Sequence, residues 1–455
     1  MRTMRTVFAG TVVFLTNLSV AWAGGIEFPT LGTEALGRGG AFVATADDGT
    51  AAYHNPAGFA MQRGTRLTLG ASLIGMDLSF RRAGSYSGGA YNGQPFPTVS
   101  NSGDPTVAPN LAFSTDFGGA LQRGTVYIAA FPPSGNGKLQ FPEQVSLPNG
   151  MTAPAPQRYD VTQKGAVVAY GVIGGAYRLT DDLDVGGGFW WGYGAFDLRT
   201  IAVVPGACAT AEDPNCDVPV DLHTTDNFAP SGNFGMLWHP TDAFAMGASV
   251  RLPVSLVGNG RARIHMPGGP AEGQSAYAAL HLDEPLMLQA GARVRPSAHS
   301  DIEVDVGWEN WSRLQNVEVD VVQVGVDRSP AMIPHDFRDT LTFRMGGEIG
   351  SESFIMRGGM FYDQGAAPDS VSRLDFAAFD KVGATAGLGI PIGSLRLDAA
   401  FAYVYQLPRD VVTSLVMPQN ALHPDQAPGG YRAVGAGHYE SSIKMLAVSL
   451  TARLD

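Results

Sequence analysis

Short stretches of alternating apolar and polar residues recur along the chain, with glycine, proline and asparagine between them. In one of the clearest, Leu397, Phe401 and Tyr403 share a face while Arg396 and Asp398 lie on the other. Alternation with a period of two is typical of β-strands whose two faces meet different surroundings. The pattern predicts an all-β protein.

We predict about fourteen strands, with boundary errors of a few residues. Every second connection is tight, and the others are long and rich in Gly, Pro and Asn. The predicted strands are roughly 65–80, 107–118, 123–135, 160–178, 182–200, 222–238, 243–265, 278–296, 300–325, 336–350, 352–363, 380–391, 395–407 and 439–454. The tight connections are 179–182, 239–242, 297–300, 350–351 and 391–394, and the long ones are 81–106, 136–159, 201–221, 364–379 and 408–438.

This sorting of connections separates a membrane barrel from a soluble sandwich. Outer-membrane barrels have short periplasmic turns and long external loops, with apolar residues facing lipid and polar residues facing the lumen. We therefore predict a transmembrane antiparallel β-barrel over residues 64–455. Aromatic residues near strand ends suit the interfacial girdles of such a barrel, although some of them could belong to a core. They are Trp190, Trp191, Trp238, Trp308, Trp311, Tyr403 and Tyr405.

The N-terminus sets the compartment. Arg2 and Arg5 precede a mostly apolar run from Val7 to Val20, and Ala21-Trp22-Ala23 fits a cleavage site. This is the pattern of a secretory signal peptide, here residues 1–23. No later uncharged apolar stretch reaches the roughly 18 residues of a membrane helix. The prediction is an exported protein of the bacterial outer membrane, in contact with its lipid.

Composition supports this interpretation. The chain has 58 glycines, a mean hydropathy of +0.01 and a formal net charge of −12. No basic stripe is present to neutralise phosphates, which argues against nucleic acid as a partner. One chain can close a barrel without a free edge, so we expect a monomer.

Residues 24–63 do not read as barrel wall. They contain helix formers and glycines but no strand alternation. The interior of a barrel of about fourteen strands is too wide for wall side chains to fill. We therefore expect this segment to be a plug (hatch) inside the lumen, which argues against an open aqueous porin.

Chemical motifs are sparse. Cys208 and Cys216 lie close together in a Pro/Asp-rich segment, and a disulfide closing a small loop is the expected state in an oxidising compartment. No histidine or second cysteine pair shares that segment, and the nine histidines show no metal-ligand spacing. No Gly-x-Ser-x-Gly, His-Glu-x-x-His or P-loop motif occurs, so we expect no catalytic residues, no metal and no cofactor. An outer-membrane lipase stays an alternative because a Ser–His pair could form in space.

Several motifs resemble the FadL/TodX family of outer-membrane transporters for long-chain fatty acids and other hydrophobic compounds. Each motif alone is weak, but their order and spacing span nearly the whole mature chain. They are Leu36-Gly37-Arg38-Gly39-Gly40-Ala41, Ala46-Asp47-Asp48, Asn55-Pro56-Ala57-Gly58, Trp238-His239-Pro240-Thr241-Asp242, Gly247-Ala248-Ser249-Val250-Arg251, Trp308-Glu309-Asn310-Trp311-Ser312 and Arg357-Gly358-Gly359-Met360-Phe361-Tyr362-Asp363.

The resemblance implies a mechanism. External loops capture a hydrophobic ligand, which passes to a site near the start of the plug and leaves sideways through a kink in the third strand. Here that strand contains Phe131, Pro132, Pro133 and Gly135. Proline cannot donate to a strand ladder, and unpaired backbone at membrane depth must line a cavity. The two prolines could instead simply end the strand at the external rim.

The resemblance also identifies plug residues, namely Arg38, Asn55, Pro56 and Ala57. We expect Arg38 to be a tether rather than a ligand contact.

Charges that alternation projects into the lumen are the remaining candidates. They are Glu303, Asp305, Arg344, Glu348 and Arg357. A polar interior needs its charges paired, so we favour a salt-bridge network that holds the plug. The alternative is that an arginine binds a substrate carboxylate through a charge-assisted hydrogen bond.

Two features depart from the family. The chain ends in Leu454-Asp455, where most outer-membrane barrels end on an aromatic residue. The cysteine-bearing segment 201–221 takes the place of a ligand-capturing loop, so the external groove is expected to be remodelled. Our leading hypothesis is passive uptake of hydrophobic molecules, such as long-chain fatty acids. The alternatives are a porin, a lipase and an adhesin, and the sequence does not distinguish a fatty acid from an alkane or an aromatic ligand.

Overall fold

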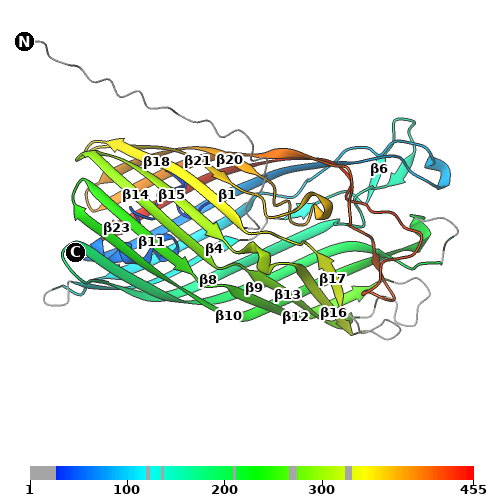
Figure 1. Cartoon of the computed structure of the whole chain (residues 1–455), viewed down its shortest axis with the longest axis horizontal. Helices are drawn as coiled ribbons and strands as arrows, with labels where there is room; N and C mark the ends of the chain where they lie inside the picture. The colour runs from blue at the N-terminus through cyan, green and yellow to red at the C-terminus, as the bar shows by residue number, and fades with distance from the viewer. Residues whose placement is uncertain are drawn as a thin grey trace, which may run out of the picture.

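A computed structural model describes residues 27–118, 123–134, 138–206, 208, 212–265, 273, 275–322 and 330–454. The chain forms a closed antiparallel barrel of 14 wall strands, several of them interrupted (Figure 1). In chain order these are β1 (Thr65–Arg82), β3 (Thr106–Thr115), β4 (Gly124–Ser134), β8 (Gln163–Arg178), β9 (Leu183–Val203), β10 (Asp217–Thr241), β11 (Phe244–Arg251) with β12 (Val254–Ile264), β13 (Ser275–Glu284) with β14 (Met287–Ser297), β15 (Ser300–Glu309) with β16 (Asn316–Val322), β17 (Ala331–Pro334) with β18 (Thr340–Gly350), β19 (Ile355–Asp363), β20 (Lys381–Ile392), β21 (Leu395–Val411) and β23 (Gly437–Arg453).

The first and last strands close the barrel. β1 pairs with β23 in one unbroken register from Arg66 opposite Arg453 to Arg82 opposite Gly437. Closure satisfies the backbone groups of both edges, which is the condition for strands to cross a bilayer. The predicted fold is confirmed. No helix among the described residues is long and apolar enough to cross a membrane.

The two faces of the wall differ as the alternation predicted. On β21, Leu397 and Phe401 point outward and are 46% and 48% exposed, while Asp398 points inward and is buried. The predicted girdle is correct for Trp191 and Trp238, which lie outside. It is wrong for Trp190, which faces the opposite side from its neighbour Trp191 on β9, and for Trp311, which lies in the helical turn η5; both side chains are fully buried.

The connections at the two ends of the barrel differ in length. Short turns gather at the end where the C-terminus lies, and the long loops project from the opposite end (Figure 1). By the rule for outer-membrane barrels, the short turns are periplasmic and the loops external. The smaller elements are α1 (Thr33–Gly37), α2 (Ala51–His54), η1 (Pro56–Met61), η2 (Gly89–Tyr91), β2 (Val99–Ser100), β5 (Leu139–Gln140), β6 (Gln144–Ser146), β7 (Thr152–Pro154), η4 (Pro214–Cys216), η5 (Trp311–Arg313), η6 (Asp369–Val371) and β22 (Gln419–Asn420).

Three strands predicted as continuous, 243–265, 278–296 and 300–325, are each broken into two. The first two breaks contain Pro253 and Pro285, which lack the N–H that a ladder position requires. The third contains η5, a single helical turn. Strand alternation on both sides hid these local interruptions.

Two segments fill the interior of the barrel. Residues 27–63 carry α1, α2 and η1, and nearly all of them are buried between opposite walls: α1 contacts β19, β20 and β21, while η1 contacts β8, β9 and β10. The blue ribbon in Figure 1 shows this segment within the barrel, toward the periplasmic end. Residues 364–380, which connect β19 to β20, fold inward from the external side and are also mostly buried. The predicted signal peptide, residues 1–23, lies outside the described residues, as does Asp455.

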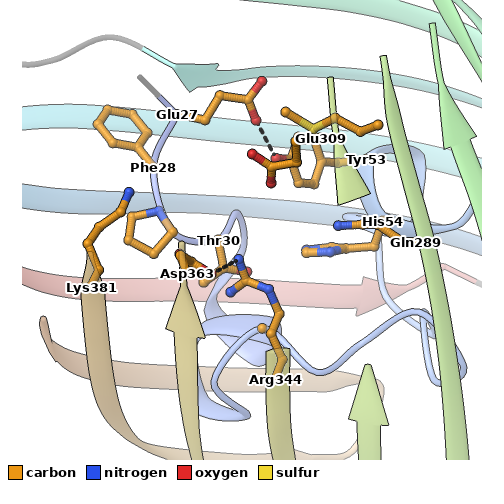
Figure 2. A pocket seen from close by; sticks show the side chains of 13 residues that line it. Glu27, Phe28, Thr30, Tyr53, His54, Gln289, Glu309, Arg344, Asp363 and Lys381 are labelled. Atoms are coloured by element: carbon orange, nitrogen blue, oxygen red, sulfur yellow. Dashed lines mark hydrogen bonds and ion pairs between the residues drawn. The ribbon is translucent and has the colours of Figure 1, made fainter. Parts of the chain in front are cut away.

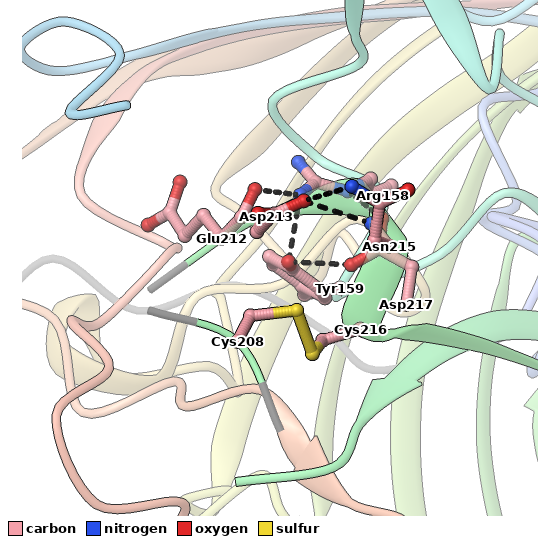
Figure 3. The surroundings of a disulfide bond; sticks show 8 residues. All are labelled: Arg158, Tyr159, Cys208, Glu212, Asp213, Asn215, Cys216 and Asp217. Atoms are coloured by element: carbon pink, nitrogen blue, oxygen red, sulfur yellow. Dashed lines mark hydrogen bonds and ion pairs between the residues drawn. A yellow bond between two sulfur atoms is a disulfide. The ribbon is translucent and has the colours of Figure 1, made fainter. Parts of the chain in front are cut away.

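A disulfide joins Cys208 and Cys216 in the loop between β9 and β10 (Figure 3). The loop is tied to the neighbouring external segment, since Arg158 Nε lies 2.6 Å from an Asp217 oxygen and the Tyr159 hydroxyl donates to the same carboxylate at 2.7 Å. The disulfide therefore closes a compact, anchored loop at the external rim.

Candidate functional site

The wall is interrupted between β3 and β4. Their described pairing runs from Thr115 opposite Val126 to Leu111 opposite Ala130 and goes no further. β3 continues to Thr106 while paired on its other side with β1, and β4 continues to Ser134. The edges of residues 106–110 and 131–134 therefore face each other without ladder hydrogen bonds in the described part of the chain.

Prolines explain why pairing stops there. Pro132 and Pro133 have no N–H to donate, and on the other side of β4 the register with β8 shifts between Phe131 and Ser134. Pro109 on β3 likewise has no N–H to donate. Gly135, the fourth residue expected at this kink, lies outside the described residues.

A cavity of about 670 Å³ occupies the interrupted wall. Lipid-facing side chains, including Leu69, Val107 and Trp191, form its outer part, and Phe28 of the plug segment is one of its linings. The cavity thus extends from the lipid-facing surface to the interior segment, and most of its lining is apolar.

Aromatic side chains cover the inner side of this cavity. The rings of Phe131 and Trp190 meet edge to face with centroids 5.3 Å apart, and Tyr53 of α2 lies 5.8 Å from Phe131 and 6.3 Å from Trp190. Tyr170 stands 5.0 Å from Trp190 and donates to Glu284 at 2.6 Å. These rings provide a rigid apolar surface beside the gap.

The start of the plug segment is fastened to the gap. The Phe28 amide donates to the Pro133 carbonyl at 3.1 Å. The adjacent Glu27 carboxylate pairs with Arg251 and accepts a hydrogen bond from the Tyr53 hydroxyl at 2.9 Å. Burial raises the pKa of Glu27 and Arg251 opposes that rise. Phe28 therefore separates the gap from the lumen.

Two small cavities meet at Phe28 on its luminal side. The first is polar and is lined by Glu27, Arg344, Asp363 and Lys381 among others (Figure 2). Arg344 Nη2 lies 3.0 Å from Asp363, so these two charges satisfy each other.

The second cavity is bounded by Ile74, Met76, Leu139 and Ala377, and Lys381 also borders it. Lys381 is buried and has no ion-pair partner among the described residues. Its side chain points toward Phe28 in Figure 2. An ammonium group thus stands where a polar cavity meets one whose lining is partly polar and partly apolar.

The interior segment is held by an ionic network centred on Arg38. The Arg38 side chain is fully buried, and its guanidinium lies 2.7 Å from Asp301, 3.5 Å from Glu303 and 3.6 Å from Glu348. Burial alone would lower the pKa of Arg38, but the carboxylates of Asp301 and Glu303 outweigh it and raise the pKa. Arg38 therefore links the interior segment to β15 and β18 through ion pairs.

A second centre of the network surrounds Glu34 of α1. Arg357 lies 3.2 Å from Glu34 and 2.7 Å from Asp398, and Arg396 pairs with both carboxylates. Burial alone would raise the pKa of Glu34, yet Arg357, Arg396 and Arg38 lower it to about 2. The charges are thus locked in their ionised forms by one another.

Wall carboxylates also accept hydrogen bonds from the plug backbone. Asp305 accepts from the amides of Phe42 at 2.8 Å and Val43 at 3.1 Å, and Glu303 accepts from the amide of Ala44 at 2.6 Å. All five predicted lumen charges face the plug segment or its cavities. Their role as a network that holds the plug stays a prediction.

The predicted Asn-Pro-Ala motif forms a joint between plug and wall. Asn55 is fully buried, donates to the Val43 carbonyl at 2.8 Å and to the Met236 carbonyl at 3.0 Å, and accepts from the Ala57 amide at 3.1 Å. Pro56 follows as the first residue of η1, where its missing N–H costs nothing. The motif caps η1 and binds it to β10.

Comparison with known proteins identifies the architecture. A sequence profile of the outer membrane protein transport protein family (OMPP1/FadL/TodX) matches residues 14–423. The chain belongs to this family. It is an outer-membrane transport protein for hydrophobic compounds, and the family consists of transporters rather than enzymes. Among curated protein sequences, none is significantly similar to this chain.

Solved structures share the barrel. A Pseudomonas aeruginosa FadL homologue superposes with a TM-score of 0.75 at 16% identity, covering 95% of this chain and 100% of the other. The Ralstonia pickettii toluene transporter TbuX gives 0.64 at 17% identity, covering 94% and 99%. The Pseudomonas putida toluene transporter TodX gives 0.67 at 15% identity, with the same coverage. At these identities the likeness establishes the fold.

Sequence reasoning missed several residues of this FadL/TodX-family site. Glu27, Tyr53 and Arg251 form a hydrogen-bonded cluster beside Phe28, and Lys381 carries the buried ammonium group. Arg251 and Lys381 stand at inward positions of their strands, so alternation alone could have flagged them. Nothing local indicated that Glu27 would meet Arg251, more than 220 residues away.

Proposed function

We propose that this protein takes up hydrophobic molecules passively and releases them sideways through the gap between β3 and β4. The observation that carries the proposal is the 670 Å³ cavity that joins lipid-facing Val107 and Leu69 to Phe28 of the plug segment. A molecule leaving there enters the lipid without crossing an aqueous compartment. We further propose that residues 24–63 act as the plug and that the protein works as a monomer surrounded by outer-membrane lipid.

A passive mechanism fits the chemistry of the interior. The sequence contains no nucleotide-binding motif, so direction would come from consumption of the ligand inside the cell. Arg38 and Asn55 bond the interior segment to the wall, which supports a plug that blocks an open aqueous path. This arrangement favours a selective route over a general porin.

We propose that the preferred ligand carries a carboxylate on an apolar tail, as a long-chain fatty acid does. Lys381 supports this because it is buried without an ion-pair partner in the described part of the chain and borders a cavity lined by Ile74, Met76 and Leu139. Glu27, Glu309 and Asp363 line the cavity beside Lys381 without forming an ion pair with it, and an incoming carboxylate would supply a direct counter-ion. The alternative, a neutral aromatic ligand, is favoured by the rings of Phe131 and Trp190.

The substrate proposal is tested by uptake of labelled palmitate and labelled toluene into cells that express each variant. Lys381→Met should lower palmitate uptake at least tenfold and leave toluene uptake unchanged, and Lys381→Arg should retain most of it. Equal uptake of palmitate by wild type and Lys381→Met would contradict a carboxylate ligand. Faster uptake of toluene than of palmitate by the wild type would favour the aromatic alternative.

The exit route is tested by restoring the backbone N–H donors that the two prolines of β4 lack. Pro132→Ala with Pro133→Ala allows the edge of β4 to pair, and uptake of the preferred ligand should fall several-fold. Pro391→Ala on β20 is the matched control and should have no effect. Leakage of small polar solutes through the wild type, without hydrophobic uptake, would refute the proposed function in favour of a porin.

A further inference from the structure

The inward-folded external segment, residues 364–380, has the form of a closed loop. β19 and β20 remain paired up to Asp363 opposite Lys381, so both ends of the segment leave the wall at one point. Asp380 accepts from the Gly365 amide at 3.3 Å and from the Tyr362 hydroxyl at 3.2 Å. Compact loops whose ends meet are self-contained Ω-loops, which can be displaced without unpairing the strands that carry them.

The segment lies across the lumen between the external side and the cavities at Phe28. Its Ala377 borders the same cavity as Lys381. Its own side chains are largely small or apolar and are buried against two hydrophobic clusters, with Leu374 and Phe379 in one and Phe376 in the other. A ligand arriving from outside meets this segment before it reaches Lys381.

A compact ionic lock holds the segment in place. Arg373 lies 2.7 Å from Asp160, which belongs to the external loop before β8, and the Leu374 amide donates to Asp160 at 2.6 Å. Asp375 lies 3.3 Å from the buried His335, and Arg373 reaches Asp375 at 3.3 Å. The described contacts thus fasten the middle of the loop through a few buried charges.

Further hydrogen bonds to the segment come from β21, the strand next to β20, and from β23, which pairs with β21. Arg409 of β21 donates to the Ala367 carbonyl at 2.6 Å, and Gln406 donates to the Ala377 carbonyl at 2.9 Å. The hydroxyl of Tyr439 on β23 donates to the Ser372 carbonyl at 3.2 Å. All three bonds are accepted by backbone carbonyls of the segment. They would therefore also form if other small residues occupied these positions of the segment.

We propose that residues 364–380 are an entrance lid that swings out of the lumen to admit ligand, and that the Arg373–Asp160 pair is its catch. The inference rests on the proposed uptake function and adds the step that precedes binding at Lys381. Breaking the Arg373–Asp160 pair removes one of the contacts that hold a loop whose ends already meet, whereas the strands on both sides keep their hydrogen bonds. The plug tethered by Arg38 stays in place during this step.

A reversible cross-link tests the lid. Asp160→Cys with Leu374→Cys introduces one thiol on each side of the contact between the Leu374 amide and the Asp160 side chain, and formation of the disulfide is verified by mass spectrometry. Oxidation should lower uptake of labelled palmitate at least tenfold relative to the same protein reduced with dithiothreitol. Dithiothreitol also reduces the native Cys208–Cys216 disulfide, so the effect of oxidation is compared with that on the control variant, which carries the same native pair. Ser79→Cys with Ser100→Cys, register partners in β1 and β2, is the matched control.

A readout independent of transport separates the lid from the uptake function. Both native cysteines are joined in the disulfide, so Lys381→Cys introduces one free thiol below the lid. A membrane-impermeant maleimide added outside should label it at least fivefold faster when Arg373→Ala is also present. Equal labelling rates, or equal uptake by the oxidised and reduced cross-link variant, would overturn the lid. Absence of palmitate and toluene uptake by the wild type, with the accelerated labelling intact, would overturn the uptake function alone.

Discussion

Replacing Arg38 with methionine should greatly increase the fraction of barrels in which the plug has left the lumen. Methionine keeps the length of the side chain but leaves Asp301, Glu303 and Glu348 without their shared counter-ion, at sites where Asp301 and Glu303 are almost fully buried. Removing one partner of a buried ion pair costs about 3–5 kcal/mol. At 1.36 kcal/mol per factor of ten, the released population should rise roughly 200-fold to 5,000-fold.

The assay is conductance of single barrels in a planar bilayer during a urea titration. Plug release opens the lumen, so the conductance step reports it directly. Arg38→Met should lower the urea midpoint by on the order of 2 M, since stability falls linearly with denaturant. Arg123→Met is the control, because Arg123 pairs with the exposed Asp181 in a periplasmic turn and such surface pairs contribute little. An unchanged midpoint in Arg38→Met would refute the tether.

Three further predictions use the same release assay. Gly359→Ala should lower the midpoint because its methyl group would overlap the backbone of Arg38, whereas Gly358→Ala, whose nearest neighbour is a carbonyl 4.0 Å away, should not. Asn55→Ala should cost about 2–4 kcal/mol, because one buried and one partly buried carbonyl lose their donor and η1 loses its cap. Burial raises the pKa of Asp47 from 3.8 to about 7, so near neutral pH the plug inside the lumen binds a proton that the released segment lacks. Lowering the pH from 8 to 6 should therefore raise the urea midpoint of the wild type. Asp47→Asn should remove most of that rise.

Each of these has an outcome that contradicts it. Equal midpoints for Gly359→Ala and Gly358→Ala would mean that the plug backbone does not pack against this wall. If Asn55→Ala has the urea midpoint of the wild type, the hydrogen bonds of the Asn-Pro-Ala motif do not stabilise the plug in the lumen. For Asp47, the sign follows from a raised pKa: stability falls as the pH rises through the window between 3.8 and about 7. A wild-type midpoint that falls between pH 8 and pH 6 would contradict the assignment.

Sequence reasoning predicted the wall well because each strand obeys a local rule. Leu397 and Asp398 lie on opposite faces because successive side chains must do so, and the lengths of the turns follow from the orientation of the barrel. Position near a strand end was the basis for placing Trp190 and Trp311 on the outside. That position does not say which side a residue faces, and both side chains are buried. Pro253 and Pro285 interrupt strands that alternation alone reads as continuous.

The sequence by itself determined the barrel, its outward apolar face, the inward charges and the prolines on β4, because each depends on residues close together in the chain. Only the tertiary structure decided which partners meet. Arg38 forms an ion pair with Asp301, Glu27 forms one with Arg251, and the edge of β3 faces that of β4 across a cavity. These contacts depend on barrel closure and strand register, which bring together residues hundreds of positions apart, and no local periodicity encodes that geometry.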